Sequence, residues 1–166
     1  MAADLRKTHA LIANQDRHLR DLLRGSLREL GIPLGNIRQC GSGADALEFL
    51  RIRQANFVIA GQQMEPIDGL SLIRVLRDPT KTPAPGIPII FCSASVDLAL
   101  LDTLYAAGVN EILVTPFNAQ AINSRVTAVL ERPRPVIRTA TYVGPDTGGP
   151  RGEADKDDDD RFWTIC

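Results

Sequence analysis

Few side chains in this sequence have the type and spacing that catalysis requires. His9 and His18 are isolated from any acid at catalytic spacing, and no Ser/His/Asp or Cys/His arrangement is visible. Cys40, Cys92 and Cys166 are odd in number and lack the short spacing of metal ligands, which is typical of a reducing compartment. We interpret the first two as small core residues and Cys166 as an exposed thiol. The sequence therefore predicts no enzyme.

One glycine-rich segment has the pattern of a phosphate-binding loop. The segment "GSGADA" (41–46) fits G-x-G-x-x-A, in which glycines let the backbone approach a pyrophosphate. That fingerprint also needs an acid at the end of the next strand, where this chain has Gly61, Gln62 and Gln63. We therefore interpret the segment as an ordinary helix start with flexible glycines.

Apolar runs and helical periodicities alternate five times along the chain. Near-continuously apolar runs predict strands, and amphipathic periodicity predicts a helix after each of them. Strands are predicted at 8–13, 34–40, 56–60, 87–92 and 110–114, and helices at 15–30, 42–53, 68–78, 95–108 and 118–132. Apolar strands alternating with helices are typical of a parallel sheet covered on both faces. Any site should lie at the carboxyl ends of those strands.

Composition and charge narrow the functional classes. The chain has 166 residues, of which 44% are hydrophobic and 23% charged, as expected of one globular domain with a substantial core. Its formal net charge of -1 gives no reason to expect nucleic acid or an acidic membrane surface as a partner. No apolar run reaches the roughly 18 residues of a membrane span, and the polar start is unlike a secretory signal. We expect a cytoplasmic protein without membrane insertion.

The character of the chain changes after Glu131. Residues 133–166 are rich in Pro, Gly and Asp and show no sustained periodicity. We therefore predict a folded domain at 1–132 and a C-terminal tail at 133–166 that lies outside the packed core.

Five segments, in order and spacing, resemble the receiver domain of bacterial two-component response regulators. They are "ALIANQD" with the helix after it, "GSGADALEFL", "FVIAGQQMEPIDGLSLI", "PIIFCSAS" and "AAGVNEILVTPFN", and together they cover about residues 8–132. The resemblance implies a flavodoxin-like doubly wound α/β fold with a five-stranded parallel sheet in the order 2-1-3-4-5. It also implies a cis peptide bond between Thr115 and Pro116.

The same resemblance assigns five positions to a phosphorylation pocket. A working receiver has two acids after strand 1, a phosphoacceptor aspartate after strand 3, a hydroxyl after strand 4 and a lysine after strand 5. The corresponding residues here are Asn14, Gln15, Gly61, Ser93 and Thr115. Only the hydroxyl is retained. Because Mg²⁺ prefers hard oxygen ligands such as carboxylates, we expect no Mg²⁺ and no other cofactor.

These losses predict a degenerate pseudo-receiver that lacks its phosphoacceptor. Asp16 and Asp68 are the nearest acids, and we interpret them as helix-stabilising residues at the starts of helices rather than as substitute phosphoacceptors. The favoured function is a phosphorylation-independent interaction module in bacterial two-component signalling. The alternative is a small-ligand sensor that uses the neutralised pocket, with Gln62 among its lining residues. Residual phosphotransfer lacks the carboxylates it needs.

The expected partner is a protein, either a histidine kinase or another regulator, and a homodimer is left open. The resemblance places the partner face on the fourth helix, fifth strand and fifth helix, with Leu101, Leu104, Tyr105 and Ile112 as candidates, although the leucines suit a core equally well. Ile112 occupies the position of the family's aromatic switch.

Two further features lie outside that face. Phe162 and Trp163 follow the acidic run "DKDDDD", and we interpret them as a docking segment for this domain or a partner. Four arginines at 17, 20, 24 and 28 line the first helix; they form either a solvated face or a site for that acidic run.

Overall fold

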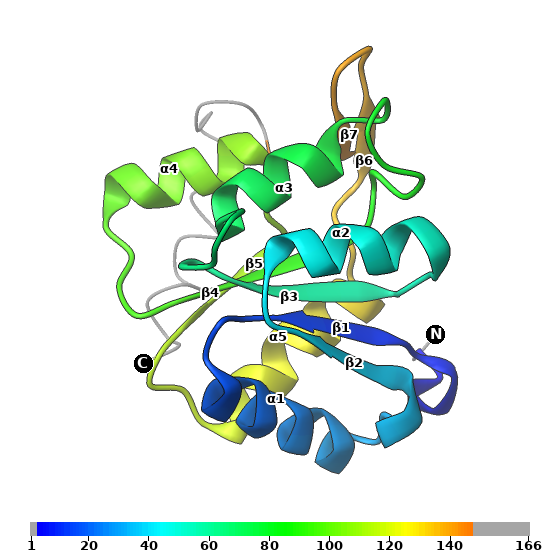
Figure 1. Ribbon diagram of the computed structural model, residues 1–166, viewed down its shortest axis with the longest axis vertical. Helices are drawn as coiled ribbons and strands as arrows, with labels where there is room; N and C mark the ends of the chain where they lie inside the picture. The colour runs from blue at the N-terminus through cyan, green and yellow to red at the C-terminus, as the bar shows by residue number, and fades with distance from the viewer. Residues whose placement is uncertain (1–2, 148–166) are drawn as a thin grey trace.

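Five parallel strands form the centre of the protein, which is described here by a computed structural model over residues 3–147 (Figure 1). In sheet order the strands are β2 (Ile37–Cys40), β1 (Ala10–Ala13), β3 (Phe57–Gly61), β4 (Ile89–Ser93) and β5 (Glu111–Val114). Every neighbouring pair is parallel. The predicted order 2-1-3-4-5 is confirmed. The predicted strand 34–40 is shorter than expected, since Leu34–Asn36 form a 3-10 turn.

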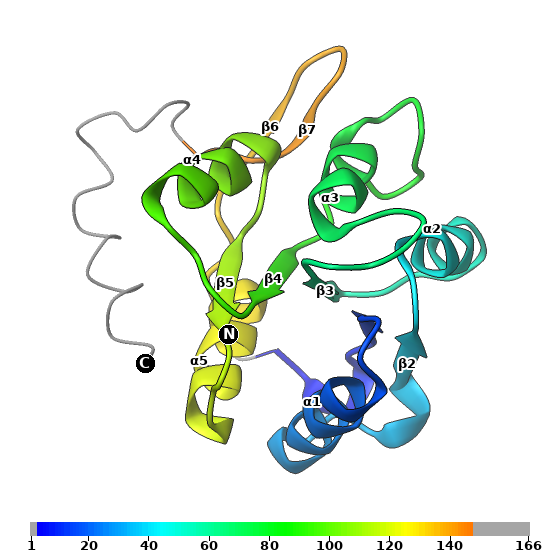
Figure 2. The ribbon, with the colours of Figure 1, turned by 60° about the vertical axis from the view of Figure 1, so that its left-hand side comes forward.

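Helices cover both faces of this sheet (Figure 2). On one face α1 (Arg17–Leu30) contacts α5 (Ala119–Glu131), and on the other α3 (Gly69–Arg77) contacts both α2 (Gly43–Ile52) and α4 (Leu98–Ala107). Because side chains alternate in direction along each strand, the two faces of the sheet carry two separate hydrophobic cores. Val58 and Ala60 of β3 pack beneath α2, α3 and α4, whereas Phe57 and Ile59 pack beneath α1 and α5.

Each long helix begins on a polar side chain directly after a strand. The caps Asp16, Ser42, Asp68, Asp97 and Asn118 each accept at least one backbone N–H of the first helical turn. The prediction that Asp16 and Asp68 stabilise the starts of helices is confirmed. These caps place the amino ends of the helices beside the carboxyl ends of the strands, which is the edge where the site was expected.

The chain after α5 differs from the predicted tail. β6 (Val136–Arg138) and β7 (Val143–Pro145) form an antiparallel hairpin. Val143 is only 3% exposed, and the Thr147 hydroxyl donates a hydrogen bond of 3.0 Å to the carbonyl of Tyr105 in α4. Residues 143–147 therefore do not lie outside the packed core. Strands of three residues are too short to give a periodic sequence signal.

A buried arginine anchors this hairpin to the domain. Arg77, the last residue of α3, is 1% exposed; its guanidinium donates to the carbonyls of Pro85, Ile87 and Gly108 and to Asn110 Oδ1. Burial lowers the pKa of Arg77 to about 10. A Cβ at Gly144 of β7 would lie 2.5 Å from Arg77 Cδ, so the hairpin backbone packs directly on this side chain.

The structure also confirms the predicted cis peptide bond and the predicted burial of two cysteines. The Thr115–Pro116 peptide bond is cis, as predicted, and so is Glu65–Pro66. Cys40 and Cys92 are buried, also as predicted, and burial raises the pKa of the Cys92 thiol to about 12. Within residues 3–147 no helix is both long and apolar enough to cross a bilayer.

Candidate functional site

A cavity lined by both polar and apolar groups lies at the carboxyl ends of β1, β3, β4 and β5, where the sequence predicted a site. Its volume is about 380 Å³. Four of the five predicted pocket residues line it, together with further residues from the same strand ends. The lining consists of Asn14, Gln15, Asp16, Leu19, Gln62, Gln63, Cys92, Ser93, Ala94 and Thr115. The fold thus brings together residues that are about 100 positions apart in the chain.

Gly61 adjoins this cavity through Asn14. The backbone at Gly61 is not among the positive-φ glycines, so its conformation does not require glycine. The lack of space does require glycine, because a Cβ at position 61 would lie 2.6 Å from Asn14 Nδ2 and 3.0 Å from Asn14 Cγ. Asn14 is 8% exposed, and its Oδ1 accepts the Asp16 backbone N–H at 2.9 Å. The amide at 14 therefore occupies the room that a side chain at 61 would need.

The retained hydroxyl is already engaged in local hydrogen bonds. Ser93 Oγ donates to Gln62 Oε1, and the Ser95 backbone N–H donates to Ser93 Oγ at 3.3 Å. Thr115 Oγ1 lies 3.4 Å from the carbonyl of Ser93, with which the Thr115 N–H also pairs. The three residues Gln62, Ser93 and Thr115 therefore form one neutral polar wall of the cavity.

The nearby carboxylates are engaged as helix caps. Asp16 Oδ1 accepts the N–H groups of His18 and Leu19, and Asp68 Oδ1 accepts that of Ser71 at 2.7 Å. The hydrogen bonds from Ser71 hold the pKa of Asp68 below its usual value. Both acids therefore have the structural role that the sequence predicted for them.

The residues of this cavity are a poor fit to the Mg²⁺ of a working receiver. A hard divalent cation takes several oxygen ligands, with carboxylates preferred. The cavity offers one carboxylate, Asp16, which is already a helix cap, while Asn14 Oδ1 accepts a backbone N–H. Among residues 3–147 no cluster of three or more His, Cys, Asp or Glu is arranged to hold a metal ion.

The predicted partner-face residues lie in the core instead of on the surface. Leu101, Leu104, Tyr105 and Ile112 are between 0% and 9% exposed and pack in the cluster beneath α2, α3 and α4. A partner cannot contact these side chains on the folded domain, so they do not form the expected partner surface. The sequence pattern could not separate them because α4 is apolar over most of its circumference. Phe162 and Trp163 lie outside the described residues.

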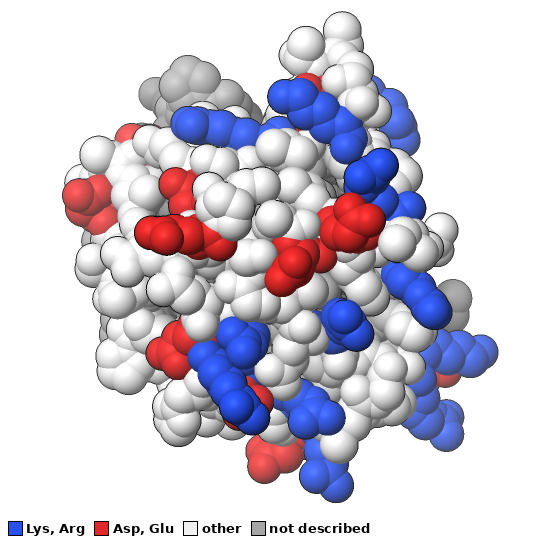
Figure 3. Space-filling model, in the orientation of Figure 1, with Lys and Arg blue, Asp and Glu red and all other residues white. Residues whose placement is uncertain are grey.

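The arginines of α1 are partly used within the domain. Arg20 Nη1 donates to the carbonyl of Asn14 at 2.7 Å, and Arg17 pairs with Asp21 at 4.0 Å. Figure 3 shows basic side chains over α1 with acidic ones among them. Arg28 lies on the exposed surface of this helix, and Arg24 is partly buried. The stripe therefore resembles a solvated face more than a single anion site.

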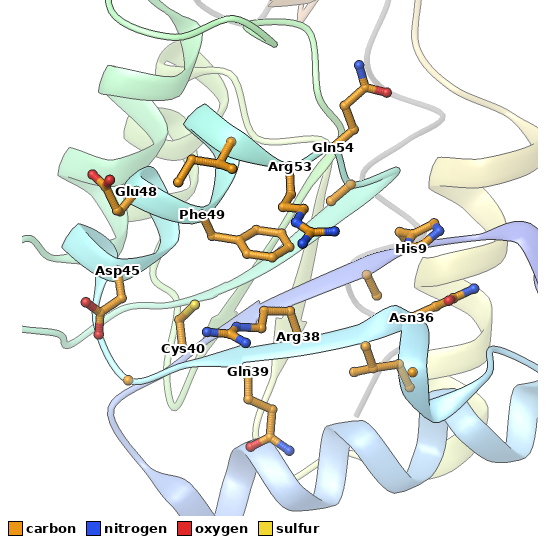
Figure 4. Close-up of a pocket in the computed structure, with 16 residues that line it drawn as sticks. His9, Asn36, Arg38, Gln39, Cys40, Asp45, Glu48, Phe49, Arg53 and Gln54 are labelled. Carbon is orange, nitrogen blue, oxygen red and sulfur yellow. The ribbon is translucent and has the colours of Figure 1, made fainter.

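Sequence reasoning missed a cavity larger than the one at the strand ends. It lies between the edge strand β2 and helix α2 and has a volume of about 1040 Å³ (Figure 4). One of its lining residues is apolar Ile52, at the end of α2, which is 74% exposed.

Comparison with known proteins agrees with this fold. The family model for the response regulator receiver domain matches residues 10–127, and the chain therefore belongs to that family. The chemotaxis protein CheY of Pseudomonas aeruginosa is 25% identical over 122 residues, which is 74% of this chain and 95% of CheY. CheY-3 of Vibrio cholerae is also 25% identical, and the match spans 74% of this chain and 91% of CheY-3.

Solved structures agree as well. A response regulator described as putative from Chloroflexus aurantiacus is 26% identical, with a TM-score of 0.67, over 76% of this chain and 100% of that one. Vibrio cholerae CheY4 has a TM-score of 0.67 at 18% identity, over 74% of this chain and 98% of CheY4, which bears on the fold alone. The chain is thus a receiver domain of two-component signalling.

Proposed function

We propose that this receiver domain acts without phosphorylation, as a protein-interaction module in two-component signalling. The observation that carries the proposal is the contact between Gly61 and Asn14. Position 61 has no side chain to phosphorylate, and the amide at 14 fills the space in which one would stand. The domain itself has no catalytic role in this proposal, and it needs neither Mg²⁺ nor another cofactor.

The rest of the cavity supports the same proposal. Phosphoryl transfer to a carboxylate requires a nucleophile, a metal that neutralises developing charge and a cation that holds the phosphoryl oxygens. Glycine, two amides and a threonine stand at those positions, and the hydroxyl of Ser93 is bonded to Gln62. Because all of these groups are absent together, no single substitution would restore phosphoryl transfer.

Incubation with a small acyl phosphate and Mg²⁺, followed by intact mass spectrometry, tests the loss of phosphorylation. The native chain should gain no phosphoryl group. A matched variant carrying Asn14→Asp, Gln15→Asp, Gly61→Asp and Thr115→Lys restores the family's groups and serves as the control for donor and conditions. A phosphorylated native chain, with the modification mapped to any aspartate of the domain, would overturn the proposal.

The partner is a histidine kinase or another regulator, and it must bind exposed residues. Of the elements expected to form the face, α4 presents Leu98, which is 59% exposed, whereas Ile112 and its three core neighbours are not accessible. Leu98→Glu should therefore weaken capture of a kinase or regulator more than a change at the buried positions that preserves folding. Unchanged capture after Leu98→Glu moves recognition away from this end of α4.

A second candidate function is recognition of a small polar ligand by the cavity. Its lining of amides and hydroxyls suits an uncharged, hydrogen-bonding molecule, and about 380 Å³ lies within the range of small-molecule sites. A thermal-shift screen of metabolites against the native chain and a Gln62→Leu variant tests it. A ligand that stabilises the native chain but not the variant supports the sensor function. If no ligand stabilises the native chain, the sensor function is rejected and the interaction module remains.

The C-terminal segment adds a docking element to the proposal. Phe162 and Trp163 join aromatic side chains to a run of four aspartates, and aromatic residues are favoured as interface anchors. We assign this segment to docking on the chain's own domain or on its partner. Trp163→Ala should then reduce protection of the segment or affinity for the partner.

A further inference from the structure

The groove between β2 and α2 is larger than the cavity at the strand ends. All four residues of β2 line it, and α2 contributes Asp45, Glu48, Phe49 and Ile52. β2 is the first strand of the sheet order and pairs only with β1 among the strands of residues 3–147. Its outer edge therefore presents backbone N–H and C=O groups without a strand partner, a surface that an extended segment can join.

Basic and acidic side chains both line this groove. Arg53 lies at the end of α2, and the side chain of Arg38 on β2 extends toward Cys40, whereas Asp45 and Glu48 lie nearer the start of α2 (Figure 4). Neither Arg38 nor Arg53 has a carboxylate ion-pair partner among the described residues, while Glu48 pairs with Arg51 at 3.4 Å. These two arginines are therefore available to pair with the carboxylates of an acidic segment.

The groove also has an apolar surface beside these charges. The Arg38 guanidinium lies 5.7 Å from the centre of the Phe49 ring, and Ile52 is 74% exposed. A segment that combines carboxylates with aromatic side chains would match both properties. Among the residues of this chain, 157–166 have that composition, with four aspartates followed by Arg161, Phe162 and Trp163.

We propose that residues 157–166 of the same chain bind this groove, adding to the edge of β2. This inference rests on the proposed docking role of Phe162 and Trp163 and specifies the surface. The aspartates lie against Arg38 and Arg53, and the aromatic pair lies against the apolar surface around Phe49.

The length of the intervening chain is sufficient. Thr147 is held at α4 by its hydrogen bond to Tyr105, and α4, α3 and α2 follow one another on the same face of the sheet. Two helix spacings of about 10 Å separate α4 from α2. Residues 148–156 can span about 30 Å when extended. The extended linker can thus reach α2, whose residues line one side of the groove, without displacing the hairpin.

Fluorescence of Trp163 provides the test, because it is the single tryptophan of the chain. In the full chain we expect a blue-shifted emission maximum and protection from acrylamide quenching. Arg38→Glu with Arg53→Glu should shift the emission to the red and remove the protection, while circular dichroism confirms folding. Replacing Asp157, Asp158, Asp159 and Asp160 with Lys in that background should restore it. Arg24→Glu, on α1, is the matched control and should have no effect.

Amide NMR shifts locate the contact independently. Ending the chain at Thr147 should change the shifts of Arg38, Cys40, Phe49 and Arg53. Changes confined to α1 or to α4, β5 and α5, or a Trp163 that is protected regardless of Arg38 and Arg53, would overturn the groove while leaving tail docking in place. Protection that appears only at high protein concentration would assign the segment to a second copy and overturn the intramolecular contact. If Trp163 is exposed under all conditions, both the groove proposal and docking of the segment on the chain's own domain are overturned.

Discussion

The side chain of Asn14 stands where a side chain at position 61 would begin, with 2.6 Å between its Nδ2 and a Cβ at Gly61. Contacts below 3 Å to a carbon require one of the two groups to move. Because Asn14 is buried and also bonds the Asp16 N–H, its displacement costs packing and a hydrogen bond. Positions 14 and 61 are therefore coupled through space.

A double-mutant cycle measures that coupling. Gly61→Ala should lower the free energy of unfolding by about 1–3 kcal/mol in the native background, since overpacking displaces Asn14. In an Asn14→Ala background the same change should be neutral or stabilise by about 0.5 kcal/mol, because alanine restricts the unfolded chain more than glycine does. Urea denaturation gives each corner of the cycle. Equal effects in both backgrounds would mean that the two residues do not interact.

Arg77 should be among the residues on which folding depends most. Arg77→Met removes the donor to three carbonyls and to Asn110 Oδ1, and it should cost about 3–5 kcal/mol of unfolding free energy. Arg74→Met is the control on the same helix, because Arg74 is exposed and its loss should change stability by only about 0.5 kcal/mol. Similar losses from both substitutions would show that the buried hydrogen bonds contribute little.

The hairpin after α5 should stabilise the domain. A chain that ends at Arg132 loses buried Val143 and the Thr147 bond to Tyr105, and it uncovers one side of Arg77. We expect it to unfold with a free energy about 2 kcal/mol or more below that of the full chain, from lost apolar burial alone. A chain that ends at Thr147 keeps all of these contacts. If the two truncations melt at the same temperature, the hairpin does not contribute.

The sheet was predictable because it depends on local pattern. Apolar runs such as 57–60 are buried on both faces and alternate with amphipathic segments, so strand and helix types follow from periodicity. The pocket positions were assigned by the resemblance to the receiver family, and the topology brings the strand ends that carry them to one edge of the sheet. The crowding of Gly61 by Asn14 was not predictable, since it depends on a rotamer and on a distance between two strands.

The errors came from residues whose burial depends on distant segments. Leu101 and Tyr105 are covered by elements far away in sequence, and an apolar helix gives no direction to a pattern analysis. No sequence pattern marks Arg77 as a buried residue. Its partners are carbonyl groups of two loops, and backbone acceptors leave no trace in sequence.

Asp68 gives α3 a pH-dependent stability. Its carboxylate accepts the Ser71 N–H, and these hydrogen bonds lower the pKa of Asp68 below the ordinary value of 3.8. A carboxyl whose pKa is lower in the folded than in the unfolded state stabilises the fold above 3.8, where it is ionised in both states. That contribution is lost as the pH falls from 3.8 through the lower pKa of the folded state.

Asp68→Asn isolates this contribution, because asparagine still caps the helix but does not titrate in this range. We expect the native chain to lose its stability advantage over the variant as the pH falls below 3.8, measured by urea denaturation from pH 7 down to the acid limit of folding. Asp68→Ala removes the cap itself and should cost about 1 kcal/mol at pH 7. Asp78, whose pKa is also lowered by its hydrogen bonds with Thr80, is present in all three proteins and cancels from the comparison. A constant difference between the native chain and Asp68→Asn across this range would mean that the Asp68 pKa is the same in the folded and unfolded states.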